Sequence, residues 1–253
     1  MNGEGYDAVP TEDPENLLGF VTTVDGQKVS ARVEQKAFVK DKDISGLLRG
    51  LHVPLAPHLD ATAKALDKVP QAEWQKLIDA GLVEPDEYDA GKGMEKHLRP
   101  VWTLKSTYFW QQTFAPLKET LIDHHYQPSV GGTVATRIGA SCSKESDPDY
   151  KAYLAKYCID ADMVKTVKAR KPTVKDGIAW SETWLSYILK TGANWAGPIK
   201  NFRLTIDKGD PKNLVSFCGE GVTKIAPTVF EMKKTDFTPA RDLDILILKP
   251  VKY

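Results

Sequence analysis

Residues 187–210 read YILKTGANWAGPIKNFRLTIDKGD, two apolar runs on either side of a Gly-Pro corner. Glycine and proline are typical of turns, and Pro198 has no N–H for a strand ladder, so it belongs at the start or edge of a strand. We therefore expect a structural corner between strands, with Trp195 packed into the core or over its end. The alternative is that Trp195 offers a stacking face to a sugar or an aromatic ligand.

Strand patterns recur on both sides of this corner. In residues 20–38, FVTTVDGQKVSARVEQKAF, two β-rich runs flank Asp25-Gly26, a pair that favours the type I′ turn of a hairpin. From residue 101 apolar side chains recur at every second position, which predicts a half-buried strand and a return strand over 120–128. The apolar positions are Trp102, Leu104, Tyr108, Trp110 and Phe114. Further strands are expected at about 184–189, 202–207, 213–217, 228–233 and 243–249.

Two stretches, about 43–82 and 147–170, carry helical signals instead. Asp60, Asp147 and Asp160 each precede a run with helical spacing, where an aspartate can accept the first free backbone N–H groups. These stretches read as helical inserts between strands.

The order of these elements predicts the fold class. Residues 86–100 lack a clear period and are expected to form a loop, and residues 129–141, SVGGTVATRIGAS, a Gly-rich connection. Strands interrupted twice by short helices indicate an α+β fold, mainly antiparallel. We expect a β-sandwich-like core in a single domain over residues 1–253.

Composition excludes several classes of protein. The chain has 253 residues, with 34 Lys and Arg against 34 Asp and Glu, so no basic excess points to nucleic acid. No apolar run approaches the roughly 18 residues of a membrane span. The first residues are acidic and lack a signal peptide's basic and apolar regions, which predicts a cytoplasmic protein if Met1 is the true start.

Phrases along most of the chain carry a resemblance to a known family. They are EDPENLLGFVTTVDGQKV, VEQKAF, HHYQPSVGG, KYCID, YILKTGANWAGPIKNFRLTIDKGDPKNLVSFCGEGV and KKTDFTPARDLDILILKP. They resemble an uncharacterised bacterial family catalogued as domain of unknown function 4424. The resemblance implies a mostly β, exported protein of Gram-negative bacteria, located in the periplasm, with no assigned reaction. Family members generally begin with a signal peptide and a strand-rich segment, so this chain looks truncated at its N-terminus.

Three cysteines, Cys142, Cys158 and Cys218, leave three possible pairings, or free thiols. Cys158 and Cys218 both lie in family-like phrases, so the resemblance favours a disulfide between them, which suits an exported protein. Buried thiols are one alternative. The other is that Cys218 is a nucleophile with His124 or His125 as its base.

Other candidate sites give weaker signals. His124 and His125 are adjacent, so on a strand they point to opposite faces and cannot readily share a metal ion; no metal site is expected. Residues 207–213, DKGDPKN, fit a tight turn better than a calcium loop. No cofactor-binding motif is present, and no cofactor is expected.

Three function hypotheses follow. The first is a non-catalytic envelope protein, a binding, structural or assembly module whose partners are envelope proteins or polysaccharide. The second is a thiol-dependent hydrolase that uses Cys218. The third is a carbohydrate-binding domain with an aromatic face of Trp195, Trp180 and Trp184, of which the last two share strand parity and so one face.

Overall fold

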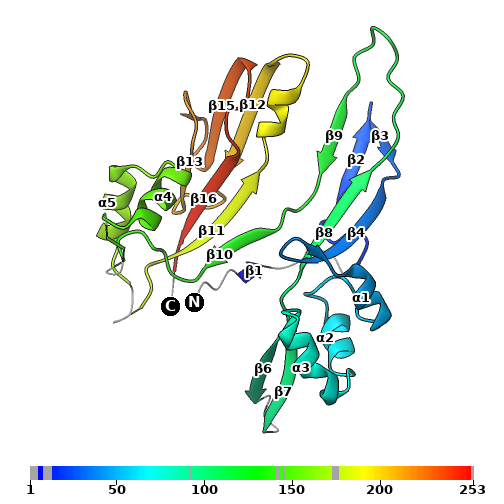
Figure 1. Ribbon diagram of the computed structural model, residues 1–253. Helices are drawn as coiled ribbons and strands as arrows, with labels where there is room; N and C mark the ends of the chain where they lie inside the picture. The colour runs from blue at the N-terminus through cyan, green and yellow to red at the C-terminus, as the bar shows by residue number, and fades with distance from the viewer. Residues whose placement is uncertain are drawn as a thin grey trace. The chain divides into compact units, whose positions relative to one another are not determined.

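The computed structural model shows an α+β protein whose strands pair antiparallel in small sheets (Figure 1). It describes residues 5–7, 13–89, 91, 93–140, 143–144, 146–172 and 177–251. Contacts between residues divide the chain into unit 1, Met1–Ala8 with Pro128–Tyr253, and unit 2, Val9–Gln127. The predicted fold class is confirmed, and the α-helices of the described residues fall within the two predicted helical stretches.

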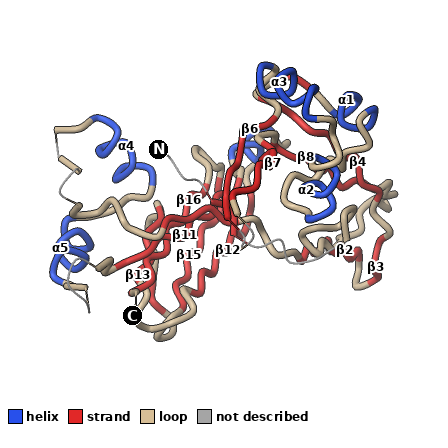
Figure 2. The backbone as a smooth tube through the Cα atoms, turned by 90° about the horizontal axis from the view of Figure 1, so that it is seen from below, coloured by secondary structure: helices blue, strands red, loops and turns tan. Residues whose placement is uncertain are grey.

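The described residues of unit 1 form two antiparallel sheets and two α-helices. The five-stranded sheet has the order β1 (Gly5–Asp7), β10 (Val130–Thr133), β11 (Trp180–Tyr187), β16 (Leu243–Pro250) and β13 (Leu214–Phe217). The three-stranded sheet has the order β12 (Ile199–Asp207), β15 (Val229–Phe237) and β14 (Thr223–Lys224). Helices α4 (Pro148–Lys156) and α5 (Ala161–Ala169) lie together on one side of the strands in both views (Figures 1 and 2).

Strand β16 is buried on both faces. Leu246 and Leu248 are 0% exposed and pack with side chains of α4 and α5, whereas Leu243 and Ile245 pack against Ile206 of β12. Successive side chains of a strand point to opposite faces, so β16 joins the helical layer to the second sheet. Each fully buried leucine contributes about 2 kcal/mol. The two sheets packed face to face through β12 and β16 are the sandwich-like part of the unit.

Strand β10 replaces the Gly-rich connection that the sequence predicts over residues 129–141. Gly131 pairs with Trp184, and a Cβ on Gly131 would lie 2.8 Å from Cε3 of that indole. A Cβ on Gly132 would lie 2.8 Å from the carbonyl oxygen of Glu182. The two glycines therefore act as strand residues at close approaches, Gly131 to the Trp184 indole and Gly132 to the backbone of β11, which glycine allows because it has no side chain.

The described residues of unit 2 form three small sheets and three α-helices. The sheets have the orders β3 (Gln27–Val29), β2 (Val21–Val24), β9 (Ile122–His125); β5 (Lys42–Asp43), β4 (Arg32–Val39), β8 (Thr103–Phe109); and β6 (Val83–Asp89), β7 (Met94–Pro100). The helices are α1 (Ser45–Gly50), α2 (Asp60–Leu66) and α3 (Gln71–Asp79). Their apolar side chains, Leu48, Leu66 and Leu77 among them, share one buried cluster with Ala37 of β4 and with Trp102.

The hairpin around Asp25-Gly26 is confirmed, but its neighbours differ from the prediction. Asp25 and Gly26 have φ angles of 49° and 80°, and β2 pairs with β3. The expected hairpin between β8 and the return strand is wrong, because β8 pairs with β4 and β9 pairs with β2. Leu121 exchanges two hydrogen bonds with Asp25, which ties β9 to the β2–β3 turn. Phe114 lies beyond β8 and is exposed.

The expected loop over residues 86–100 is also wrong, since β6 and β7 form a hairpin there. Opposite charges face each other across it: Arg99 pairs with Glu84, and Lys96 Nζ lies 3.2 Å from Glu87 Oε1. Such cross-strand pairs stabilise a hairpin without apolar alternation.

The predicted helix caps are confirmed at two of three positions. Asp147 accepts a hydrogen bond from the backbone N–H of Asp149 at 2.9 Å, and Asp160 accepts one from Met163 at 2.7 Å. Asp60 is instead the first residue of α2, and Leu59 occupies the cap position.

Candidate functional site

Cys158 and Cys218 form a disulfide, as the resemblance favours. The bond joins the segment after α4 to the end of β13, and the two Cα atoms lie 5.1 Å apart. The cysteines are 60 residues apart, and a cross-link over that length contributes roughly 4 kcal/mol in a chain-entropy account of the unfolded state. Cys142 lies outside the described residues.

Polar contacts around the disulfide hold the end of α4 against β13. Ser216 Oγ donates to the carbonyl oxygen of Tyr157 at 2.9 Å. Arg241 Nη2 donates to the carbonyl oxygen of Lys156 at 3.1 Å, and its Nη1 lies 3.9 Å from Cys158 Sγ. The last carbonyls of a helix lack partners within the helix, and Arg241 supplies a donor to one of them.

Cys218 and His124, two residues of the hydrolase hypothesis, have other partners in the structure. In the disulfide, Cys218 Sγ carries no proton and is no thiolate, which is the nucleophilic form of cysteine. All five histidines of the chain fall in unit 2, whereas Cys218 belongs to unit 1. His124 lies in an aromatic cluster, with Nδ1 2.9 Å from Thr22 Oγ1 and its ring stacked on Phe20, and His125 lies next to it on β9.

Two of the three candidate tryptophans pack in a core cluster. Trp180 Nε1 donates to the carbonyl oxygen of Val167 at 3.3 Å, and Trp184 Nε1 donates to Glu182 Oε2 at 2.8 Å. Both indoles pack in the same cluster, on the helical side of the five-stranded sheet. Their shared strand parity therefore gives them one face, and that face is core.

Trp195 differs from its prediction. The corner itself is confirmed: a 3-10 helix, η1 (Lys190–Asn194), leads from β11 to β12. However, Trp195 is 65% exposed, so the expectation that it packs into the core is wrong. Leu189 packs in the core, and Gly192 is buried against Pro239. Because these residues close the corner, the indole is left on the surface.

A buried carboxylate that the sequence did not single out lies beside Trp184. Glu182 is 3% exposed. Its Oε1 accepts hydrogen bonds from Thr136 Oγ1 at 2.6 Å and from the Arg137 backbone N–H at 2.9 Å. Burial, and then the nearby charge of Glu182, raise the pKa of Tyr153. Donors to both carboxylate oxygens indicate that Glu182 anchors the segment after β10 rather than reacting.

The turn over residues 207–213 is confirmed and contains a buried lysine. Asp207 Oδ1 accepts from the backbone N–H of Gly209, which has a φ angle of 80°. Lys208 Nζ donates to the carbonyl oxygens of Pro211 and Asn213, and burial lowers its pKa. Within the described part of the chain, no group of three or more His, Cys, Asp and Glu side chains is placed to hold a metal ion.

His97 connects two elements of unit 2. Its Nδ1 lies 2.9 Å from Asp67 Oδ1 at the end of α2, and its Nε2 lies 3.4 Å from Glu95 Oε2 on its own strand, β7. The ring stacks on Tyr88 of β6. The hydrogen bond to Asp67, with the charge of Glu95, raises the pKa of His97.

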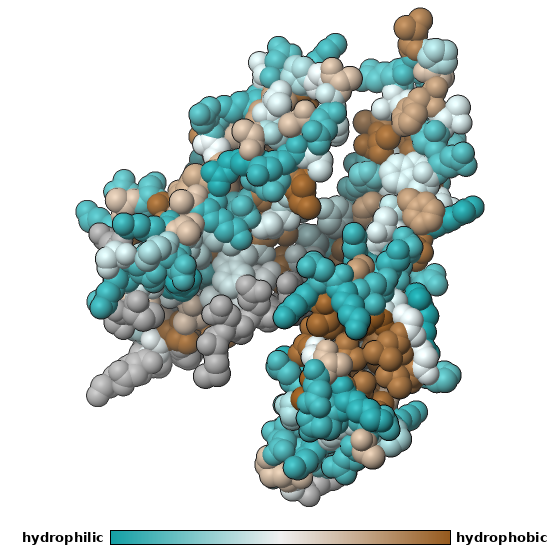
Figure 3. Space-filling view, in the orientation of Figure 1, coloured by the Kyte–Doolittle hydropathy of each residue, from teal (hydrophilic) through white to brown (hydrophobic). Residues whose placement is uncertain are grey.

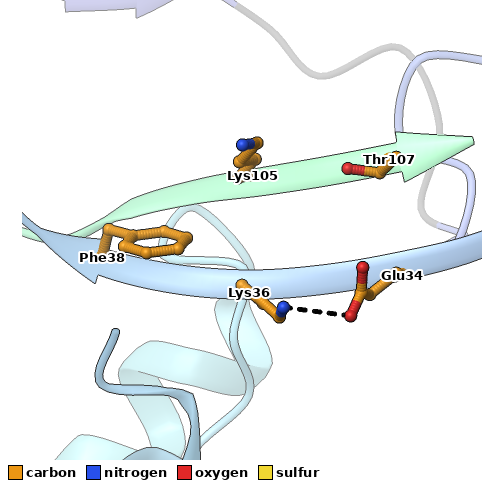
Figure 4. Close-up of a pocket in the computed structure, with 5 residues that line it drawn as sticks. All are labelled: Glu34, Lys36, Phe38, Lys105 and Thr107. Carbon is orange, nitrogen blue, oxygen red and sulfur yellow. Dashed lines mark ion pairs between the residues drawn. The ribbon is translucent and has the colours of Figure 1, made fainter. Parts of the chain in front are cut away.

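A shallow hollow of about 110 Å³ opens on the outer face of β4 and β8 (Figure 4). It is lined by Glu34, Lys36 and Phe38 of β4 and by Lys105 and Thr107 of β8. Lys36 and Lys105 are direct cross-strand partners, and Lys36 Nζ lies 3.1 Å from Glu34 Oε1. No sequence pattern marks this site, because its two halves come from strands that are distant along the chain.

Comparison with known proteins gives one match. A family described as Domain of unknown function (DUF4424) matches residues 1–246. The chain belongs to this family. No curated protein and no solved structure matches it. The matched residues include most of both units and both cysteines of the disulfide, and the description of the family names no reaction.

The His97 contacts predict a pH-dependent stability. The folded-state pKa of His97 is raised above the ordinary value of 6.5, so the stabilisation by the protonated ring is full below that value. It is lost as the pH rises through the folded-state pKa. Urea unfolding of the wild type and of His97→Gln should therefore differ more at about pH 5.5 than at about pH 8.5.

Asp67→Asn is the matched variant for this measurement, because it removes the partner of His97 and keeps its size. In Asp67→Asn, the gain in stability on going from about pH 8.5 to about pH 5.5 should be smaller than in the wild type. An unfolding midpoint that shifts equally at both pH values in His97→Gln would contradict this account of the contact.

Proposed function

We propose that this chain is a non-catalytic binding or assembly module of the bacterial cell envelope, located in the periplasm. The observation that carries the proposal is the Cys158–Cys218 disulfide. Disulfides form and persist in oxidising compartments such as the periplasm and are rare in the cytosol. The formal net charge of zero gives no electrostatic attraction to nucleic acid, and no described helix is long and apolar enough to cross a membrane.

The buried charged side chains support binding over catalysis. Glu231 accepts from Arg203 Nε at 2.5 Å and lies 2.7 Å from Lys233 Nζ. Lys208 and Glu182 are likewise held by groups of their own unit. Catalytic acids and bases face a cleft in which a substrate can reach them, whereas these groups have partners that fix the fold.

Exposed apolar side chains support the same proposal. The connection between β8 and β9 carries exposed Phe114, Leu117 and Leu121, and Figure 3 shows brown atoms at its far end. Large apolar side chains gathered on one protruding segment are typical of surfaces that other molecules cover.

Thiol trapping in cells tests the proposal. Cells that naturally produce the protein are quenched in acid, and free thiols are labelled with a maleimide of high mass in denaturant. Of the three cysteines, one should react before reduction and all three after it, and osmotic shock should release the protein with the periplasmic fraction. Three reactive cysteines without reduction, in a chain that stays with the cytoplasm, would contradict the proposal.

The same experiment separates the alternative, a thiol-dependent hydrolase. That function needs Cys218 as a free thiol in the working protein, because only the thiolate attacks a substrate. An oxidised Cys218 in freshly quenched cells counts against it, and a free Cys218 in a periplasmic chain favours it.

A carbohydrate-binding role is the second candidate, and the exposure of Trp195 favours it. An exposed indole offers an apolar face on which a sugar ring can stack. Titration with cell-wall and polysaccharide fragments should change the intrinsic fluorescence of the wild type and of Ile188→Ala, a second exposed apolar residue of unit 1, but not of Trp195→Ala. No response across the panel would contradict this role.

A further inference from the structure

The outer face of β4 and β8 is polar and uncovered by the helices of unit 2. Ala37 of β4 points to the other face, where it is fully buried in the cluster beneath α1–α3. Because side chains alternate along a strand, the neighbours of Ala37 point outward. The outward side chains are Arg32, Glu34, Lys36 and Phe38 on β4, and Thr103, Lys105, Thr107 and Phe109 on β8.

The charges on this face do not balance. Lys36 and Lys105 lie directly opposite each other, an arrangement of like charges that is unfavourable. Glu34 provides a carboxylate for Lys36. Lys105 makes no ion pair with any residue that the structure describes. The face therefore lacks a negative charge beside Lys105. A carboxylate bound there would make the same kind of contact with Lys105 that Glu34 makes with Lys36.

The size of the hollow limits what can occupy it. Its volume of about 110 Å³ is well below the roughly 300 Å³ of a small-molecule site, so it holds one side chain rather than a whole ligand. Figure 4 shows Lys105 and Thr107 along one strand and Lys36 and Glu34 along the other. Phe38 lines one end of the hollow, and Phe109, 45% exposed, lies further along the same face.

Among the described residues, β8 is the last strand of its sheet. A segment in extended conformation can pair with the free edge of such a strand, and every second side chain of that segment then falls on one face of the sheet. A segment added beside β8 would thus bring alternate side chains to the hollow.

We propose that the outer face of β4 and β8 binds an extended acidic segment of a partner protein, which adds to the edge of β8 and places a carboxylate beside Lys105. The inference rests on the proposed function as a binding module and names its surface and the chemistry of its partner. The binding is electrostatic in part, so it weakens as salt screens the charges.

Peptide binding to the purified chain tests the proposal. The probe is a capped hexapeptide of alternating Glu and Val, and its control is the same peptide with Gln in place of Glu. Fluorescence anisotropy should show saturable binding of the Glu peptide, about tenfold tighter than the Gln peptide, and weaker at high salt. Amide resonances of residues 103–109 should shift in NMR spectra.

Lys105→Gln should weaken binding of the Glu peptide about fivefold, the upper range for an exposed ion pair, and leave the Gln peptide unchanged. The matched control, Lys64→Gln on α2, should change neither. Because Lys105 faces Lys36, its replacement should leave the thermal midpoint unchanged or higher, whereas a lower midpoint would give Lys105 a structural role and overturn the proposal.

Three further results would overturn it. They are no binding of the Glu peptide at millimolar concentration, equal binding by Lys105→Gln, and self-association of the chain that Lys105→Gln abolishes, which would make the partner a second copy. The assay uses purified protein, so its failure leaves the thiol result in cells unaffected. Conversely, a reduced cytoplasmic chain would contradict the proposed function alone.

Discussion

The packing of β16 on both of its faces is the constraint on which unit 1 depends. Leu246 and Leu248 hold α4 and α5 on one side, and Leu243 and Ile245 hold the second sheet on the other. Strand β16 is also paired on both edges, with β11 and β13. The same placement brings Cys158, after α4, to Cys218, after β13, so the disulfide follows from the layers that β16 organises.

Unit 2 divides its residues differently. One face of the sheet formed by β5, β4 and β8 contributes Ala37 to the buried cluster of the three helices, and the outer face keeps its charges. A covered sheet face contributes stability through apolar burial, whereas an uncovered polar face contributes little and remains available for contacts. The hollow at Lys36 and Lys105 lies on that uncovered face. A partner that binds there leaves the buried side chains of the other face in place.

Local chemistry explains what the sequence predicted and what it missed. The run LDILILKP predicted a strand, and Asp147 and Asp160 predicted helix starts, because these signals act within a few residues. The hairpin of β6 and β7 escaped because its strands are held partly by charge pairs, which leave no apolar period. Strand β10 was missed because its glycines leave room for Trp184 and for the Glu182 carbonyl, which belong to a strand far along the chain.

Sites were harder to predict than elements, because they depend on register. The surface position of Trp195 follows from Leu189 and Gly192 filling the corner, which no local pattern reveals. Lys36 and Lys105 lie opposite each other because β4 pairs with β8. The sequence pattern predicted instead that β8 pairs with the return strand, β9. The disulfide was anticipated only through the family resemblance, since spacing alone left three pairings.

Native-state hydrogen exchange at residues 245–248 tests the role of β16 most directly, measured in the wild type and in Leu246→Ala. In the wild type these amides should exchange only through global unfolding of unit 1, because both faces of the strand are covered. In Leu246→Ala their free energy of opening should fall by about 3 kcal/mol, together with that of β11. Fast exchange of β16 in the wild type, or protection unchanged by Leu246→Ala, would contradict the account.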